Sequence, residues 1–210
     1  MVGIVATALI ISDGNRGTQG SGTSGSTTPS STSTSSGKRS STTPTTTTTT
    51  RTPQDDVLLA ALPAVYKTGI TCQPAHPGAG ATAMVKCGKP NTPVDPRWQM
   101  PSEAEFRLFP DRNSQDAYFL ALVTSRGIPR NDARGGCRPK EDPIHYALYY
   151  RDTSGPLPGE FTTCFLDDGT AQVWWVDSKT LTIGALKEPG NIDTLDQLDL
   201  WWNTSILSAS

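Results

Sequence analysis

The chain has 210 residues, a net charge of -2 at neutral pH and charged side chains at only 18% of its positions. Residues 1–53 carry four basic side chains and one acidic one, so the remainder of the chain is the acidic part. Nucleic-acid-binding proteins need a clustered basic face, so we expect no nucleic-acid partner. The remainder is long enough for one domain with a substantial hydrophobic core.

The N-terminal stretch is apolar but short. Residues 2–12 read VGIVATALIIS, whereas about 20 apolar residues are needed to cross a bilayer. No basic segment precedes this stretch, and no clean small-residue cleavage site follows it. We therefore expect residues 1–12 to be the outer half of a single transmembrane helix that begins upstream, which predicts a single-pass protein of the cell membrane. A weak signal sequence is the alternative interpretation.

Residues 13–51 are predicted to be a disordered linker. Serine and threonine fill 23 of the 30 positions from 21 to 50, with no aliphatic or aromatic side chain among them. Such a segment cannot bury enough surface to offset the entropy of ordering it. Its threonines suit O-linked sugars, although bare linkers have the same composition. The predicted organisation is a partial transmembrane helix (1–12), this linker (13–51) and an extracytoplasmic domain (52–205).

Three helices are predicted in that domain. The first begins at Thr52-Pro53 and ends before Pro63, because threonine caps a helix and proline suits its first position. The second covers about 113–125, with Asn113 as its cap. The third is capped by Asp193 and reads TLDQLDLWW. Each has an apolar stripe at helical spacing.

Six strands are predicted, and three of them form a meander near the C-terminus. The meander strands are 161–166, 171–176 and 181–186, separated by turns at 167–169 and 177–179; the other strands are 83–87, 106–109 and 145–150. Asp168-Gly169 between β-rich runs is a strong hairpin signal. Strands flanked by helices predict an α+β fold, with an antiparallel sheet of about five to six strands and helices packed on one face. Large apolar groups on both faces of the meander predict that its second face is partly covered.

Four cysteines, Cys72, Cys87, Cys137 and Cys164, all lie in the predicted domain. None belongs to a CxxC pair, which argues against a zinc ribbon or a thioredoxin-like site. An even number behind an apolar N-terminus indicates two disulfides in an oxidising compartment. Of the three pairings, we favour Cys72–Cys87 and Cys137–Cys164, since each closes a short loop. Four reduced core cysteines are the alternative.

The chain offers few candidate catalytic groups. The chain has two histidines, His76 in a loop and His145 at a strand start beside Asp142. No GxSxG motif accompanies them, so a structural role is the favoured interpretation of His145. The pair Asp167-Asp168 lacks the calcium-binding loop pattern. We predict no catalytic residue, no metal site and no cofactor.

Aromatic residues supply the candidate ligand surface. Aromatic rings beside polar groups can stack on sugars or line a groove. The pairs Trp174-Trp175 and Trp201-Trp202 each comprise neighbours whose side chains diverge, so one of each is expected to be exposed. The predicted ligand-surface residues are Trp98, Trp174, Trp201 and His145. A core role for most of these residues is the alternative.

Several segments in order resemble a known family. They are LLAALPAVY, TC…VKCG, FRLFPDRNSQDAYF, GGC…TTC, AQVWWVDSKTLTIGAL and LDLWW. Together they resemble the extracytoplasmic C-terminal sensor domain of actinobacterial, especially mycobacterial, receptor-type serine/threonine protein kinases. That resemblance implies the outer signalling part of a membrane kinase. No Gly-rich ATP loop, HRD or DFG motif occurs in this chain, so kinase activity is not implied for it.

The expected function is therefore a non-enzymatic, ligand-sensing domain outside the membrane. Its partner would be a cell-wall glycan, a small molecule or a protein. Two alternatives remain. One is a secreted or envelope-associated hydrolase that uses His145. The other is a structural envelope protein whose sheet pairs with a second copy to form a homodimer.

Overall fold

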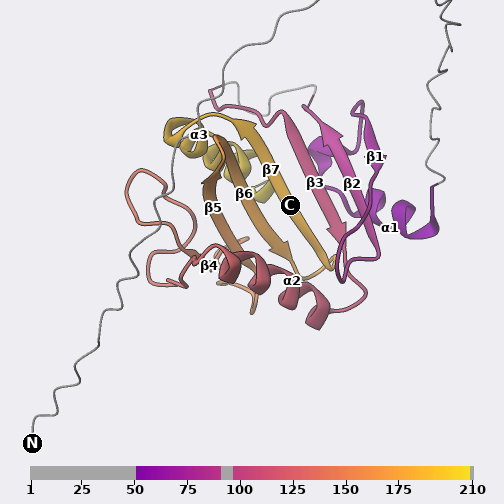
Figure 1. Ribbon diagram of the computed structural model, residues 1–210, viewed down its shortest axis with the longest axis horizontal. Helices are drawn as coiled ribbons and strands as arrows, with labels where there is room; N and C mark the ends of the chain where they lie inside the picture. Colours follow the sequence, from indigo (N-terminus) through magenta and orange to yellow (C-terminus); the bar gives the residue numbers. More distant parts are fainter. Residues whose placement is uncertain (1–50, 91–96, 209–210) are drawn as a thin grey trace, which may run out of the picture. The chain divides into compact units, whose positions relative to one another are not determined.

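The computed structural model describes residues 51–90 and 97–208, and these form an α+β domain (Figure 1). Its sheet has seven antiparallel strands in the order β1-β2-β3-β7-β6-β5-β4. The predicted fold class is confirmed, with more strands than expected. The strands are β1 (Cys72–Pro74), β2 (Ala83–Gly88), β3 (Glu103–Leu108), β4 (Tyr146–Leu148), β5 (Phe161–Asp167), β6 (Thr170–Asp177) and β7 (Thr182–Pro189).

Three α-helices accompany the sheet: α1 (Pro53–Ala61), α2 (Arg112–Ser125) and α3 (Ile192–Trp202). A 3-10 turn, η1 (Ala64–Tyr66), follows α1, and a π-helical turn, η2 (Asn203–Leu207), continues α3. No helix within 51–90 and 97–208 is long and apolar enough to cross a membrane. The predicted membrane segment and residues 13–50 of the predicted linker lie outside the described residues.

The predicted meander is confirmed as β5, β6 and β7. Asp168 and Gly169 connect β5 to β6 with φ angles of 46° and 71°. Positive φ at both central residues matches the twist of a two-residue hairpin, and Asp-Gly accepts it at low cost. β7 then pairs along its length with β3, so the meander is joined directly to the N-terminal strands.

Helices cover both faces of the sheet. Leu58 of α1 and Leu198 of α3 pack in one hydrophobic cluster with Trp175. Phe119 of α2 packs in a second cluster with Trp174, the neighbour of Trp175. The expectation that all helices lie on one face is therefore corrected: α2 crosses the face opposite to α3 (Figure 1). Because neighbouring strand residues point to opposite faces, the bulky side chains on both faces of the meander need cover on both sides.

The helix starts were predicted with mixed success. Thr52 is the predicted cap of α1, and it forms a capping box with Asp55, in which the Thr52 Oγ1 accepts from the Asp55 N–H at 3.2 Å. The cap of α2 is Asp111 rather than Asn113, and the cap of α3 is Asn191 rather than Asp193. Each true cap lies two residues earlier, because several residues in a row are able to accept a capping hydrogen bond.

Both predicted disulfides are present. Cys137–Cys164 joins the loop after α2 to β5, with a Cα–Cα distance of 5.8 Å. Cys72–Cys87 joins β1 to β2 at 4.1 Å, slightly closer than the expected range of about 4.4–6.8 Å. The two residues are directly opposite each other in the ladder, and the flanking Gly88 N–H donates to the Thr71 carbonyl. They therefore form a non-hydrogen-bonded pair, whose Cα atoms approach to about 4.5 Å.

Candidate functional site

A pocket of ≈250 Å³ opens where the end of α1, the sheet and η2 meet. Its walls combine aromatic rings from the sheet and α3 with charged side chains from the loops, among them Lys67, Phe106, Tyr149, Arg151, Trp175 and Trp202. Ligand pockets for drug-sized molecules occupy about 300–1,000 Å³. The aromatic pocket, as we call this site, is thus of a size for a small ligand.

Four aromatic rings form the apolar wall of the aromatic pocket. The ring centroids of Trp175 and Trp202 are 6.0 Å apart, Phe106 lies 5.9 Å from Trp175, and Tyr149 lies 5.4 Å from Trp202. Such spacings are typical of favourable aromatic packing. The four rings therefore pack together as one wall, with Phe106 and Trp175 from the sheet and Trp202 from α3.

Gly184 of β7 makes room for this wall. It is the ladder partner of Trp175, and a Cβ at this position would lie 2.1 Å from the Trp175 ring. Only a residue without a side chain lets the indole lie across β7. The neighbouring Trp202 Nε1 is buried and has no hydrogen-bond partner among the described residues. Buried donors normally have partners, so this unpartnered N–H of a pocket-lining residue calls for an explanation.

Arg151 and Asp177 form the polar wall, and the buried Glu160 contacts Arg151 without lining the pocket. Arg151 donates to the two Glu160 carboxylate oxygens at 2.7 and 3.1 Å and pairs with Asp177 at 3.0 Å. Glu160 is fully buried and also accepts from the Ser178 backbone and hydroxyl. Burial would raise the pKa of Glu160, but the hydrogen bonds from Arg151 and Ser178 outweigh burial and lower it. The carboxylate therefore stays ionised and holds the guanidinium in place.

Charges around the aromatic pocket balance. Arg151 and Lys67 are positive, whereas Glu160 and Asp177 are negative. The guanidinium also donates to the Tyr149 hydroxyl at 3.0 Å, and that hydroxyl donates to the Val176 carbonyl at 2.8 Å. An aromatic wall facing a fixed, neutralised set of polar groups can stack on the apolar side of a small neutral molecule and bind its hydroxyls or amides.

The predicted ligand-surface residues lie elsewhere. Trp201 is fully buried, and Trp174 is 4% exposed on the α2 face, where its N–H donates to Gln172 Oε1 at 2.9 Å. Trp98 packs, half-buried, against the core. The expectation that one tryptophan of each pair is exposed is wrong, because helices cover both faces of the sheet. The tryptophans that line the aromatic pocket are instead the other members of the pairs, Trp175 and Trp202.

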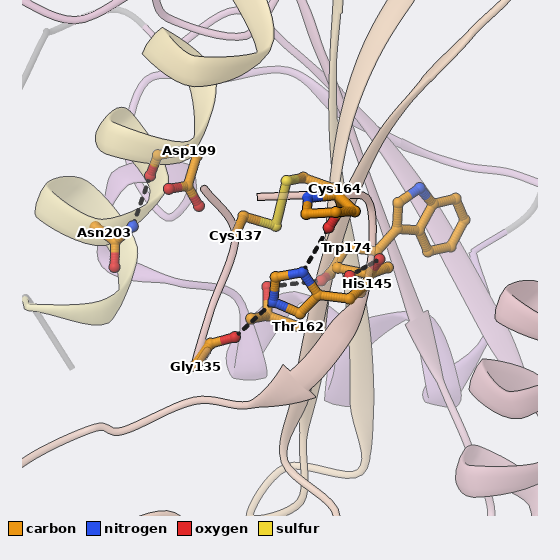
Figure 2. The surroundings of a disulfide bond; sticks show 10 residues. Gly135, Cys137, His145, Thr162, Cys164, Trp174, Asp199 and Asn203 are labelled. Atoms are coloured by element: carbon orange, nitrogen blue, oxygen red, sulfur yellow. Dashed lines mark hydrogen bonds between the residues drawn. A yellow bond between two sulfur atoms is a disulfide. The ribbon is translucent and has the colours of Figure 1, made fainter. Parts of the chain in front are cut away.

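His145 is buried and held by the backbone. Its Nδ1 lies 2.8 Å from the Pro143 carbonyl oxygen, and its Nε2 lies 3.0 Å from that of Gly135 (Figure 2). The adjacent carboxylate, Asp142, pairs with Arg134 at 3.1 Å. Neither ring nitrogen is placed against a serine, a thiol or a carboxylate, so the hydrolase alternative loses its base. The structural interpretation of His145 is favoured.

Arg151, Glu160 and Asp177 were not anticipated as site residues. Arg151 and Glu160 lie in the connection between β4 and β5, whereas Asp177 ends β6, and only the chain reversals around β5 and β6 bring them together. Within the described part of the chain, no group of three or more histidine, cysteine, aspartate or glutamate residues could hold a metal ion. No protein-family model, curated protein or solved structure shows a significant match to the chain.

Proposed function

We propose that this domain is an extracytoplasmic ligand-binding module whose ligand occupies the aromatic pocket. The observation that carries the proposal is the combination of a four-ring wall with the buried, unpartnered Trp202 N–H. The two disulfides support the extracytoplasmic address, because such bonds persist in oxidising compartments.

The ligand class follows from the size and charge of the pocket. Since the charged groups neutralise one another, a neutral molecule meets no uncompensated charge on entry. Since one wall is aromatic and the other carries hydrogen-bonding groups, the molecule should have one apolar face and several hydroxyl or amide groups. A sugar ring, free or as part of a wall glycan, has this chemistry.

The parentage of the domain is a separate part of the proposal. The segments that resemble the sensor domain of receptor-type serine/threonine kinases support a role as the outer, signalling part of such a membrane protein. The sequence encoded upstream of Met1 tests this directly, because an in-frame kinase domain with a basic juxtamembrane segment is expected there.

The ligand proposal is tested by blocking the pocket from its rim. Ala64 lines the pocket and is solvent-exposed, so Ala64→Trp places an indole at the entrance without altering the core. We expect the protein to show saturable amide shifts in a heteronuclear NMR titration with glucose or N-acetylglucosamine. In Ala64→Trp, binding should weaken at least about tenfold, as expected when the added indole keeps the ligand away from its stacking wall.

The matched control is Ala60→Trp, which adds the same ring to an exposed position of α1 that does not line the pocket. It should bind the sugars as the unaltered protein does. Glucosamine and glucose 6-phosphate, which are charged, should bind more weakly than the neutral sugars. Equal binding by Ala64→Trp and Ala60→Trp, or shifts confined to other parts of the domain, would contradict the proposal.

A further inference from the structure

A second pocket, of ≈380 Å³, lies between α3 and the loop that carries Cys137. It shares no lining residue with the aromatic pocket. Its polar lining is mostly acidic and includes Arg138, Glu141, Asp196, Asp199 and Asn203, with Cys137 beside them. We call it the acidic pocket.

Asp199 is the unusual member of the acidic pocket. Its side chain extends from α3 toward the Cys137–Cys164 disulfide (Figure 2), and the residue is only 5% exposed. Its Oδ1 has no hydrogen-bond partner among the described residues. Burial, followed by the negative charge of Asp196, raises the pKa of Asp199 to about 7, against a smaller opposing effect of Arg138. A buried carboxyl group without a partner is costly and calls for an explanation.

The other charges of the acidic pocket already have partners. Arg138 pairs with Glu141 at 3.4 Å, and Lys140 pairs with Asp196 at 3.2 Å. Lys140 also pairs with Asp193 at 3.0 Å. When Asp199 is ionised, its charge is therefore the uncompensated one in this pocket. His145, on the other side of the disulfide, is occupied by backbone carbonyls.

Asn203 adds a neutral acceptor. Its side-chain Nδ2 donates to the Asp199 backbone carbonyl at 2.9 Å (Figure 2), which leaves its side-chain oxygen as an acceptor. A protonated amine carries three donors and one positive charge, and hydrogen bonds from such a group to a carboxylate are strong. The acidic pocket lacks the clustered ligands that a metal ion needs, so an organic cation fits better.

We propose that the acidic pocket binds a primary ammonium group, with Asp199 as its counter-ion. The amine enters beside the Cys137–Cys164 disulfide and donates to the Asp199 carboxylate and to the Asn203 side-chain oxygen. Binding requires the ionised form of Asp199, so a bound amine lowers the pKa of this carboxyl group. Between pH 5 and pH 8 the ionised fraction of a group with a pKa of about 7 rises about 100-fold, and the affinity should rise in parallel.

The test uses n-butylammonium chloride and its neutral counterpart n-butanol as probes of the full chain. Amide NMR titrations at pH 8 should show butylammonium shifts centred on Cys137, Asp199 and Asn203, with at least tenfold weaker effects of butanol. The shifts should fall away at pH 5. The carboxyl ¹³C resonance of Asp199 should titrate at lower pH when butylammonium is present.

Asp199→Asn is the key variant, because the amide keeps the shape of the protonated acid. It should weaken butylammonium binding at least about tenfold, as for the loss of a hydrogen bond to a charged group. The matched control, Asp196→Asn, removes a more exposed carboxylate that already pairs with Lys140 and should weaken binding less than about fivefold. Equal shifts from butanol and butylammonium would overturn the proposal, as would undiminished binding by Asp199→Asn or an unmoved Asp199 titration.

Discussion

Glu105 shows how three cations keep one buried carboxylate ionised. The residue is 3% exposed, and its carboxylate oxygens contact Lys86 at 2.9 Å, Lys187 at 2.7 Å and Arg107 at 2.7 Å. Burial alone would raise the pKa of Glu105, but the hydrogen bonds from Lys187, Lys86 and Arg107 lower it to about 2. This cluster links β2, β3 and β7 across the middle of the sheet.

The depressed pKa of Glu105 predicts how the domain responds to acid. Because the folded state binds the proton less well than the unfolded state, the stabilisation is complete above pH 4.5 and is lost as the pH falls toward 2. Glu105→Gln should cost about 3 kcal/mol of unfolding free energy at pH 7 and flatten this acid dependence. Urea unfolding at several pH values measures both effects. Glu103→Gln, at a side chain 43% exposed, is the control and should cost less than about 1 kcal/mol.

Gly184 gives a second prediction at the scale of a residue. Gly184→Ala places a methyl group against the Trp175 ring, so the indole must move and the wall of the aromatic pocket with it. We expect a loss of about 1–3 kcal/mol in unfolding free energy, together with altered tryptophan fluorescence.

The matched control is Gly88→Ala in β2, where an added Cβ meets no atom within 4 Å. This change should be neutral or stabilise the domain by up to about 1 kcal/mol, since it restricts the unfolded chain. If the Gly184→Ala protein were as stable as the Gly88→Ala protein, the Trp175 ring could move without loss of unfolding free energy, and the prediction would be wrong.

At the scale of an element, local sequence patterns were sufficient to predict most helices and strands. The Thr52 cap of α1 and the Asp-Gly turn between β5 and β6 are encoded within a few residues, and both were predicted. β1 was missed because its three residues contain Pro74 in a proline- and glycine-rich stretch, and only pairing with β2 makes them a strand. The side of the sheet that α2 occupies likewise depends on long-range packing.

The residues of the candidate site likewise depend partly on local sequence patterns and partly on long-range packing. The aromatic residues of the C-terminal half could be recognised as important, but the choice between Trp174 and Trp175 depends on which face of the sheet borders the pocket beside α1. The contact between Arg151 and Glu160 joins a loop to the start of the meander, and no local sequence pattern predicts this contact. The disulfide pairing was predictable because each pair closes a short segment.

The two disulfides set the stability of the domain as a whole. The bonded cysteines are 15 and 27 residues apart in sequence. By the loop-entropy relation, these cross-links contribute about 3 and 3.6 kcal/mol. Their sum of about 6.6 kcal/mol rivals the entire stability of a typical domain, about 5–15 kcal/mol.

Reduction is therefore expected to lower the melting temperature sharply. Calorimetry with and without a thiol reductant measures the effect of both bonds, and the double variants Cys72→Ala/Cys87→Ala and Cys137→Ala/Cys164→Ala separate them. The two losses should add, because the bonds lie in different parts of the sheet. An unchanged melting temperature after complete reduction would contradict this prediction.

The two outermost strands of the sheet have a further consequence for how the molecule behaves among its own copies. β1 and β4 have three residues each, whereas the five strands between them have six to eight. An unpaired strand is a template on which another chain can add hydrogen bonds, and short edges that contain proline are poor templates. The long, aromatic-rich strands that would aggregate most readily are thus all internal, and each border offers only a brief ladder that Pro74 interrupts on one side.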